Sequence, residues 1–266
     1  MSLTAHTLPR LRYFAFPGRC YAARVALFNS LGKAGWIDER IGMIAFRKLK
    51  ATALKRRQAL GTGAGADAAN NEQDPILTSN NLPQLLLPAE YIRPMSSASS
   101  TVLTQSHAIA RFAARMPVLP GSTHCPIYTL YPQQSSLQDL YEAALIDEAM
   151  ALVDSVVGLA PKDEDKELRL QKRAAYIEDF TGPLWLALNL LEERLGKKDF
   201  LVGEGSGSLS LADLYLKKPL TDMILEQQFE GVSPEWVRRK FPALIDHSAR
   251  VQEHALIQEY LTHYRN

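Results

Sequence analysis

Two places in the sequence combine reactive or anion-binding side chains with the expected start of a helix. Cys20 lies where a Pro-Gly turn leads into a helical pattern, and a helix N-terminus lowers the pKa of a thiol and raises its reactivity. Gln105 and Ser106 supply an amide and a hydroxyl at the first turn of another helical pattern. Together with free backbone N–H groups, these side chains predict a binding site for a carboxylate.

These residues also have purely structural interpretations. A cysteine is commonly buried and inert, and Ser106 could serve only as the N-cap of its helix. Tyr13 carries a hydroxyl that could stabilise an anion, but it lies beside Phe14 and Phe16 in an expected strand, where aromatic side chains are frequent core residues. The residue types alone leave both interpretations open.

The first hundred residues alternate strand and helix patterns. We expect strands at residues 11–16, 36–41, 83–87 and 101–104. We expect helices at residues 21–31, with Gly32 as C-cap, and at 45–58 and 106–115. Residues 59–74 are rich in Gly, Ala and Asn and almost lack large apolar side chains, so a mobile insertion is expected there. This order predicts an α/β domain.

From residue 117 onwards the expected elements are a linker and helices. Four prolines mark residues 117–134 as the linker. Apolar spacing predicts a helix from Leu137 after the cap Ser136, a second over 177–195, a third from Ser210 and a fourth over 244–261. Ser210 and Asp213 have the spacing of a capping box, with Leu209 and Leu214 placed as a hydrophobic staple. We interpret this motif as structural, and the whole segment as an all-α domain.

Composition excludes several classes of protein. The 266 residues include 30 Lys+Arg and 29 Asp+Glu, a formal net charge of +1, which argues against a nucleic-acid partner bound by bulk charge. Cys20 and Cys125 are far apart, the amino terminus lacks the apolar core of a signal peptide, and no apolar run is long enough for a membrane span. No nucleotide-binding motif or metal-ligand spacing occurs. We therefore predict a cytoplasmic protein without a metal site.

Four segments, in order, resemble the tyrosine-type cytosolic glutathione S-transferases (sigma, alpha, pi and mu classes). Residues 12–14 (RYF) with Gly18-Arg19 are similar to the first strand and loop of the family, and residues 81–85 (NLPQL) to its cis-proline turn. Residues 103–109 (LTQSHAI) resemble the start of its third helix, and 200–203 (FLVG) with 209–213 (LSLAD) its carboxy-terminal signature. The resemblance covers most of the chain. It implies a thioredoxin-like domain at residues 8–116 and a helical domain at 135–266.

The resemblance assigns catalytic roles to two residues. Tyr13 would be the catalytic tyrosine, and Arg19 would be the arginine that supports the thiolate of glutathione. Lowering the pKa of a thiol from about 8.5 by about two units takes roughly 2.7 kcal/mol, which a phenol hydroxyl and aligned backbone dipoles can supply.

The resemblance also implies how glutathione would be held. Gln105 and Ser106 would bind the γ-glutamyl end, and Leu82, before a cis-Pro83, would pair with the central peptide. Lys50 would bind the glycine carboxylate. Phe46 takes the place of a tryptophan in that segment and cannot donate the indole hydrogen bond, while the other basic residues nearby are interpreted as a solvated face.

The implied activity is attack of the glutathione thiolate on a hydrophobic electrophile held by the helical domain, in a homodimer. Tyr141, Met150, Tyr215 and Tyr260 are candidates for that pocket or for the core. The acid that several classes send to the neighbouring subunit's glutathione would fall near Ala151, so that contact is missing or is supplied by another residue. The alternatives are a glutathione-dependent isomerase or peroxidase, a thiol transferase that uses Cys20, and a non-catalytic structural or docking module.

Overall fold

The computed structural model describes residues 8–61, 82–88, 91, 100–117, 124–133, 135–202 and 209–264. Its amino-terminal part contains a four-stranded mixed sheet in the order β2-β1-β3-β4. The strands are β1 (Arg10–Phe14), β2 (Ile37–Ile41), β3 (Gln84–Pro88) and β4 (Ser100–Thr104). Strand β1 is parallel to β2 and antiparallel to β3, which is antiparallel to β4. The four predicted strands are confirmed, with small shifts at their ends.

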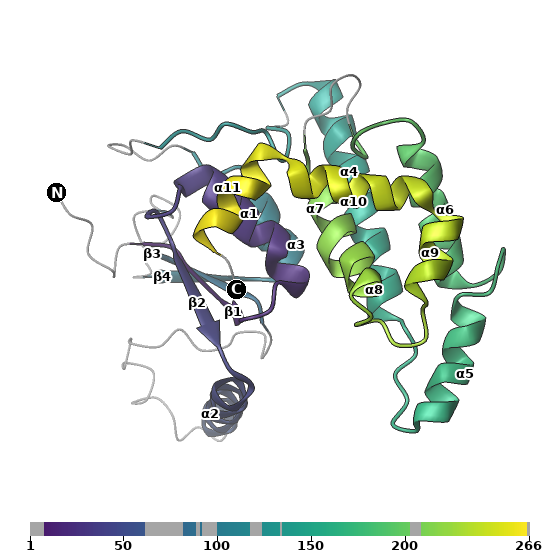
Figure 1. The fold of residues 1–266 in the computed structure, drawn as a ribbon. Helices are drawn as coiled ribbons and strands as arrows, with labels where there is room; N and C mark the ends of the chain where they lie inside the picture. Colours follow the sequence, from purple (N-terminus) through teal and green to yellow (C-terminus); the bar gives the residue numbers. More distant parts are fainter. Residues whose placement is uncertain are drawn as a thin grey trace.

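Three of the described α-helices belong to the same part of the chain as the sheet. Helices α1 (Tyr21–Leu31) and α3 (Ser106–Ala114) pack against each other, and every residue of α1 is buried. Helix α1 ends as predicted, because the N–H of Gly32, at a φ of 68°, bonds the carbonyl of Phe28. Helix α2 (Met43–Gly61) lies apart from the other two, beyond the end of β2 (Figure 1). Residues 59–61 of the expected insertion are thus helical, and residues 62–74 lie outside the described residues.

The carboxy-terminal part consists of helices, which lie on the far side of α1 and α3 from the sheet (Figure 1). They are α4 (Leu137–Gly158), α5 (Lys166–Tyr176), α6 (Pro183–Leu195), α7 (Leu211–Leu216), a π-helical turn η5 (Lys217–Asp222), α8 (Met223–Leu225), α9 (Pro234–Lys240), α10 (Pro242–Glu253) and α11 (Ala255–His263). Ser136 caps α4 as predicted, by accepting a hydrogen bond from the N–H of Asp139 at 3.0 Å. None of the described helices has the length and hydrophobicity needed to cross a bilayer.

Two predicted helices are wrong because each is interrupted. The expected helix over 177–195 is a loop followed by α6, which begins with Pro183 after Gly182. A Cβ on Gly182 would lie 2.5 Å from the carbonyl oxygen of Tyr176, so the turn requires glycine. The expected helix over 244–261 breaks at His254, whose imidazole accepts a hydrogen bond from the N–H of Leu256 and starts α11.

The last helix returns to the first domain. Tyr260 packs its ring edge-to-face against Tyr21 and Phe28 of α1, and Tyr264 packs against Phe28 and Trp36. The described residues 124–133 contain no helix or strand, and we keep 8–116, 117–134 and 135–266 as our proposal for the two domains and the linker.

A buried carboxylate lies in the first turn of α7. Asp213 is fully buried and accepts hydrogen bonds from the backbone N–H groups of Leu201 and Ser210, both at 2.8 Å, and from the Ser210 hydroxyl at 2.6 Å. The Nε2 atom of His247 lies 2.9 Å from the same carboxylate. The predicted capping box is confirmed, and it also ties the loop before α7 to α10.

Candidate functional site

The sheet brings most of the predicted site residues to one end of its strands. Arg12 of β1 lies opposite Gln84 of β3, and Gln84 lies opposite Thr104 of β4. Because β1 and β4 run parallel and β3 runs against them, Tyr13, Pro83 and Gln105 are the next positions at the same end of the sheet. The Leu82–Pro83 peptide bond is cis, as expected from the sequence.

Gln105 has a strained backbone at the point where β4 passes into α3. Its φ of 72° is unusual for a residue with a side chain, and such strain is frequent at functional sites. The conformation begins α3 at Ser106, whose side chain is buried while that of Gln105 is exposed. The Gln105 side chain does not cap this helix, so the first N–H groups of α3 can receive an anion.

Tyr13 lies at the wall of a cavity of about 430 Å³ between the two domains. The β1–α1 loop forms one side, and a Cβ on Gly18 would approach the Tyr13 hydroxyl to 3.1 Å. Helix α4 and the segment from η5 to the loop after α8 form the other side. The lining residues are Tyr13, Phe16, Pro17, Gly18, Arg19, Val157, Lys218, Pro219, Met223, Glu226 and Gln228.

The Tyr13 hydroxyl is held in its protonated form. Burial, with a smaller effect of Cys20, raises the pKa of Tyr13 to about 12, against the opposing effects of Arg24, Arg19 and a hydrogen bond from the Arg19 backbone N–H. A neutral phenol is a hydrogen-bond donor near neutral pH, so Tyr13 can donate to an anion in the cavity.

An ultraviolet difference titration of the wild type against Tyr13→Phe tests this environment. We expect the Tyr13 phenol to ionise near pH 12 rather than near its ordinary pKa of 10.0. Below pH 10 the phenol is protonated in both folded and unfolded chains. Between about pH 10 and 12 only the unfolded chain ionises, so this residue lowers the stability as the pH rises through that window. Ionisation of Tyr13 at pH 10 or below would contradict the buried placement.

Arg19 lines the cavity but is already engaged by a carboxylate. Its Nε lies 3.3 Å from Oδ1 of Asp154 on α4, and Oδ2 of Asp154 lies 3.0 Å from Nε2 of His107 on α3. The Arg19 side chain is about two-fifths exposed (41%), so its guanidinium remains accessible from the cavity. Asp154 lies one turn after Ala151, the position at which the resemblance would place the cross-dimer acid, and Ala151 itself is exposed on α4.

Lys50 does not line the cavity. Its ammonium lies 5.0 Å from the centre of the Phe46 ring, and Phe46 packs edge-to-face on Phe14, at 5.3 Å between ring centres. Phe14 in turn contacts Tyr13. Aromatic contacts through Phe14 therefore connect the start of α2 to Tyr13, while Lys50 lies on an exposed surface.

Cys20 does not have the environment of a nucleophile. It is fully buried at the end of the short 3-10 helix before α1. Burial is the main cause that raises its pKa to about 12, because the thiolate would be desolvated. The structure therefore favours the inert interpretation of this cysteine and gives no support to the thiol transferase alternative.

The four candidates for the electrophile pocket or the core do not line this cavity. Met150 and Tyr215 are in the core, Tyr141 is exposed, and Tyr260 packs on α1. The residues that do line the cavity from the helical domain, chiefly Lys218, Met223 and Glu226, were missed from the sequence. A proline inside a helical pattern, Pro219, is the one signal that marks this segment, because proline removes a helix hydrogen bond and widens the turn into η5.

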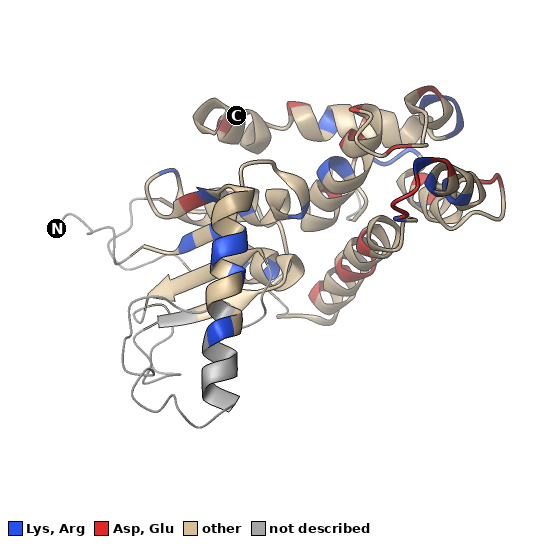
Figure 2. Ribbon diagram, turned by 90° about the horizontal axis from the view of Figure 1, so that it is seen from below, with Lys and Arg blue, Asp and Glu red and all other residues tan. Residues whose placement is uncertain are grey.

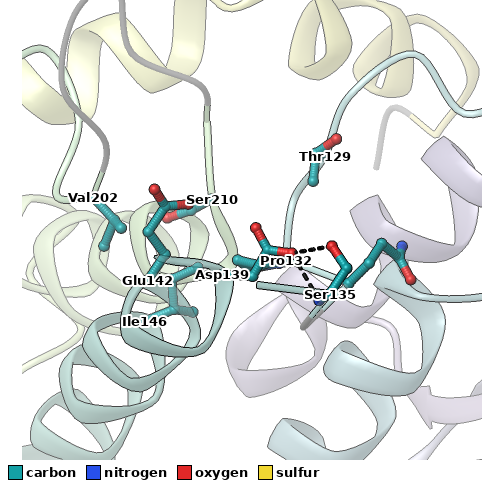
Figure 3. A pocket seen from close by; sticks show the side chains of 9 residues that line it. Thr129, Pro132, Ser135, Asp139, Glu142, Ile146, Val202 and Ser210 are labelled. Carbon is teal, nitrogen blue, oxygen red and sulfur yellow. Dashed lines mark hydrogen bonds between the residues drawn. The ribbon is translucent and has the colours of Figure 1, made fainter. Parts of the chain in front are cut away.

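A second cavity, of about 330 Å³, lies where the linker meets the start of α4. Figure 3 shows Asp139, Glu142 and Ser210 at its walls, with Asp139 accepting hydrogen bonds from Ser135. It contains none of the predicted site residues. We therefore assign the candidate site to the cavity at Tyr13.

A thioredoxin-like sheet with a cis-proline turn, joined to an all-helical domain that closes a cavity over its edge, defines the class of fold. Solved structures of this fold match nearly the whole chain. The sigma-class GST of Fasciola hepatica is 18% identical, with a TM-score of 0.64 over 98% of each chain. The glutathione S-transferase of Ascaris lumbricoides is 20% identical, with a TM-score of 0.58 over 97% of this chain and 98% of that one. Prostaglandin synthase D of Nilaparvata lugens is 15% identical, with a TM-score of 0.60 over 96% and 97%.

The chain therefore has the glutathione S-transferase fold, which confirms the predicted fold class. No protein-family model matches the sequence, and no curated protein matches it. Within the described ranges, no group of three or more His, Cys, Asp or Glu side chains is placed to hold a metal ion.

Proposed function

We propose that the protein is a glutathione transferase in which Tyr13 stabilises the glutathione thiolate. The observation that carries this proposal is the position of Tyr13 at the wall of the interdomain cavity, beside Arg19. The cis-Pro83 turn and the free start of α3 lie at the same end of the sheet. The similar folds of proteins named glutathione S-transferases give independent support.

Each part of glutathione would meet a different element. The γ-glutamyl carboxylate would bind the start of α3 at Gln105 and Ser106, and the cysteinyl backbone would pair with Leu82 in the manner of an added strand. The thiol would then lie at Tyr13. Lys50 remains our choice for the glycine carboxylate. To bind it, the Lys50 ammonium would have to move away from the Phe46 ring.

The chemistry needs one proton transfer and one displacement. The thiol of glutathione loses its proton to solvent, and the thiolate accepts a hydrogen bond from the Tyr13 hydroxyl. The guanidinium of Arg19 adds a favourable charge. The thiolate then attacks an electrophilic carbon in the cavity and forms a carbon–sulfur bond. Either a leaving group departs with its electron pair, or a double bond is saturated and the resulting carbanion takes a proton from solvent. The apolar walls from Phe16, Val157 and Met223 suit a hydrophobic electrophile.

Calorimetric titration of glutathione and S-hexylglutathione into the wild type and Ser106→Ala tests the thiol site. We expect micromolar to millimolar binding, weakened about tenfold or more by Ser106→Ala, because a hydrogen bond to a charged carboxylate contributes about 1.5–3 kcal/mol. Ser155→Ala, at an exposed serine of α4, is the matched control and should bind like the wild type.

Failure of the folded protein to bind either ligand would contradict the transferase proposal and favour a docking module. Binding of both ligands without conjugation of any electrophile would favour an isomerase or peroxidase on the same thiol site. The homodimer remains part of our proposal, and the exposed Leu137, Leu140 and Tyr141 of α4 offer an apolar surface for it. Sedimentation velocity measures the assembly directly.

A further inference from the structure

Helix α2 is strongly basic, whereas the rest of the chain has more acidic than basic residues. Its 19 residues contain no Asp or Glu but carry the basic residues Arg47, Lys48, Lys50, Lys55, Arg56 and Arg57. The whole chain has 30 basic and 29 acidic residues, so these six leave 24 basic against 29 acidic residues elsewhere. A nearly neutral protein therefore concentrates positive charge on one helix.

The described basic side chains of α2 form no ion pair within the part of the chain that the structure describes. Arg47, Lys48 and Lys55 are exposed and form no ion pair with any described residue, and Lys50 contacts only the Phe46 ring. Elsewhere, basic side chains such as Arg24, Arg111 and Arg169 lie within 3.0 Å of a carboxylate. Figure 2 shows the blue segments of α2 with no red segment on the same helix. The positive field of α2 is thus available to a partner.

The exposed surface of α2 mixes these charges with apolar side chains. Phe46 and Leu49 are half-buried and mark the side of the helix that faces the protein. At helical spacing, the opposite side carries Met43, Ile44, Arg47, Lys48, Leu54 and Lys55, which we call the outer face of α2. Met43, Ile44 and Leu54 are 52%, 74% and 52% exposed, although such side chains gain by leaving water.

We propose that the outer face of α2 binds the surface of a bilayer that contains anionic phospholipids. Lys and Arg near such a surface are attracted by the headgroup charge, and apolar side chains between them can enter the boundary of the acyl region. A nucleic acid would use the same cations, but its phosphate backbone offers no apolar environment to Met43, Ile44 and Leu54. An anionic lipid surface can accommodate both the basic and the apolar side chains of the outer face. Binding is peripheral and reversible, because the helix lies along the surface.

Vesicle co-sedimentation of the full chain tests the proposal without glutathione, so its outcome is independent of the proposed transferase activity. We expect binding to phosphatidylcholine vesicles that contain phosphatidylserine, little binding to pure phosphatidylcholine, and weaker binding at high salt. The double variant Lys48→Glu and Lys55→Glu should bind about tenfold or more weakly. The control Lys197→Glu and Lys198→Glu makes the same charge change on an exposed loop of the helical domain and should retain most binding.

A second pair of variants separates lipid from other polyanions. Met43→Ser with Ile44→Ser leaves the charge unchanged, and we expect it to weaken vesicle binding severalfold while circular dichroism shows the fold intact. No binding of the folded wild type to phosphatidylserine vesicles would overturn the proposal. Equal losses in the α2 and control pairs would also overturn it. Binding to single-stranded RNA that depends on Lys48 and Lys55, without vesicle binding, would assign the surface to nucleic acid instead.

Discussion

Replacing Tyr13 with phenylalanine is expected to lower kcat/KM for glutathione conjugation by about 10- to 150-fold. The change removes one hydroxyl, and a hydrogen bond to a charged group contributes about 1.5–3 kcal/mol. The Tyr13 ring would keep its contacts with Phe14 and Phe16, so the fold should not change. Conjugation kinetics at saturating glutathione measure the effect. A pH titration of the ultraviolet absorbance of the bound thiolate should show a raised thiol pKa in the variant.

Two comparisons make the Tyr13 result specific. S-hexylglutathione has no free thiol to ionise, so its affinity should be nearly the same in the wild type and Tyr13→Phe. Cys20→Ala should retain conjugation, because Cys20 is fully buried and its pKa is raised to about 12. The tyrosine mechanism would be wrong if Cys20→Ala abolished activity in a folded protein while Tyr13→Phe kept it.

Replacing Asp213 with alanine is expected to lower the free energy of unfolding by about 3–5 kcal/mol. The fully buried carboxylate accepts hydrogen bonds from two backbone N–H groups and from the Ser210 hydroxyl, and His247 lies against it. Removal leaves these buried groups without their partner, which costs more than the loss of a surface contact. Urea unfolding followed by circular dichroism measures the change.

Ser210→Ala separates the cap from the rest of this network. That change removes one hydroxyl from the capping box and should cost only about 1 kcal/mol. A loss in Asp213→Ala no larger than the loss in Ser210→Ala would show that the bonds to Leu201 and His247 contribute little. Neither residue lines the cavity at Tyr13, so the folded variants should keep their affinity for S-hexylglutathione.

Elements with local signals could be predicted from the sequence. The glycine that ends α1, the serine that caps α4 and the Ser210–Asp213 spacing each determine backbone hydrogen bonds within a few residues. The loop before α6 was missed because the apolar spacing of residues 177–195 continues across it, although Gly182 and Pro183 mark the break. The break at His254 has no such marker, because there a side chain caps the next helix.

The candidate site was only partly predictable for a different reason. Tyr13, Leu82 and Gln105 lie in or directly beside strands that the sequence predicts. A resemblance in short segments was therefore enough to place them at the same end of the sheet. Lys218 and Glu226 reach the cavity only through the packing of η5 on α4 and the β1–α1 loop. Asp154 likewise meets Arg19 across the two domains. The two residues are 135 positions apart in the chain, so no local sequence pattern could predict their contact.

The packing of α11 on α1 also has a consequence for biosynthesis. Tyr260 and Tyr264 cover Phe28 and Trp36, which are translated more than two hundred residues earlier. During translation, Phe28 and Trp36 therefore stay uncovered by Tyr260 and Tyr264 until the entire helical domain has been synthesised. Nascent chains halted before residue 255 would present these rings to chaperones, and completion of the last helix would end that exposure.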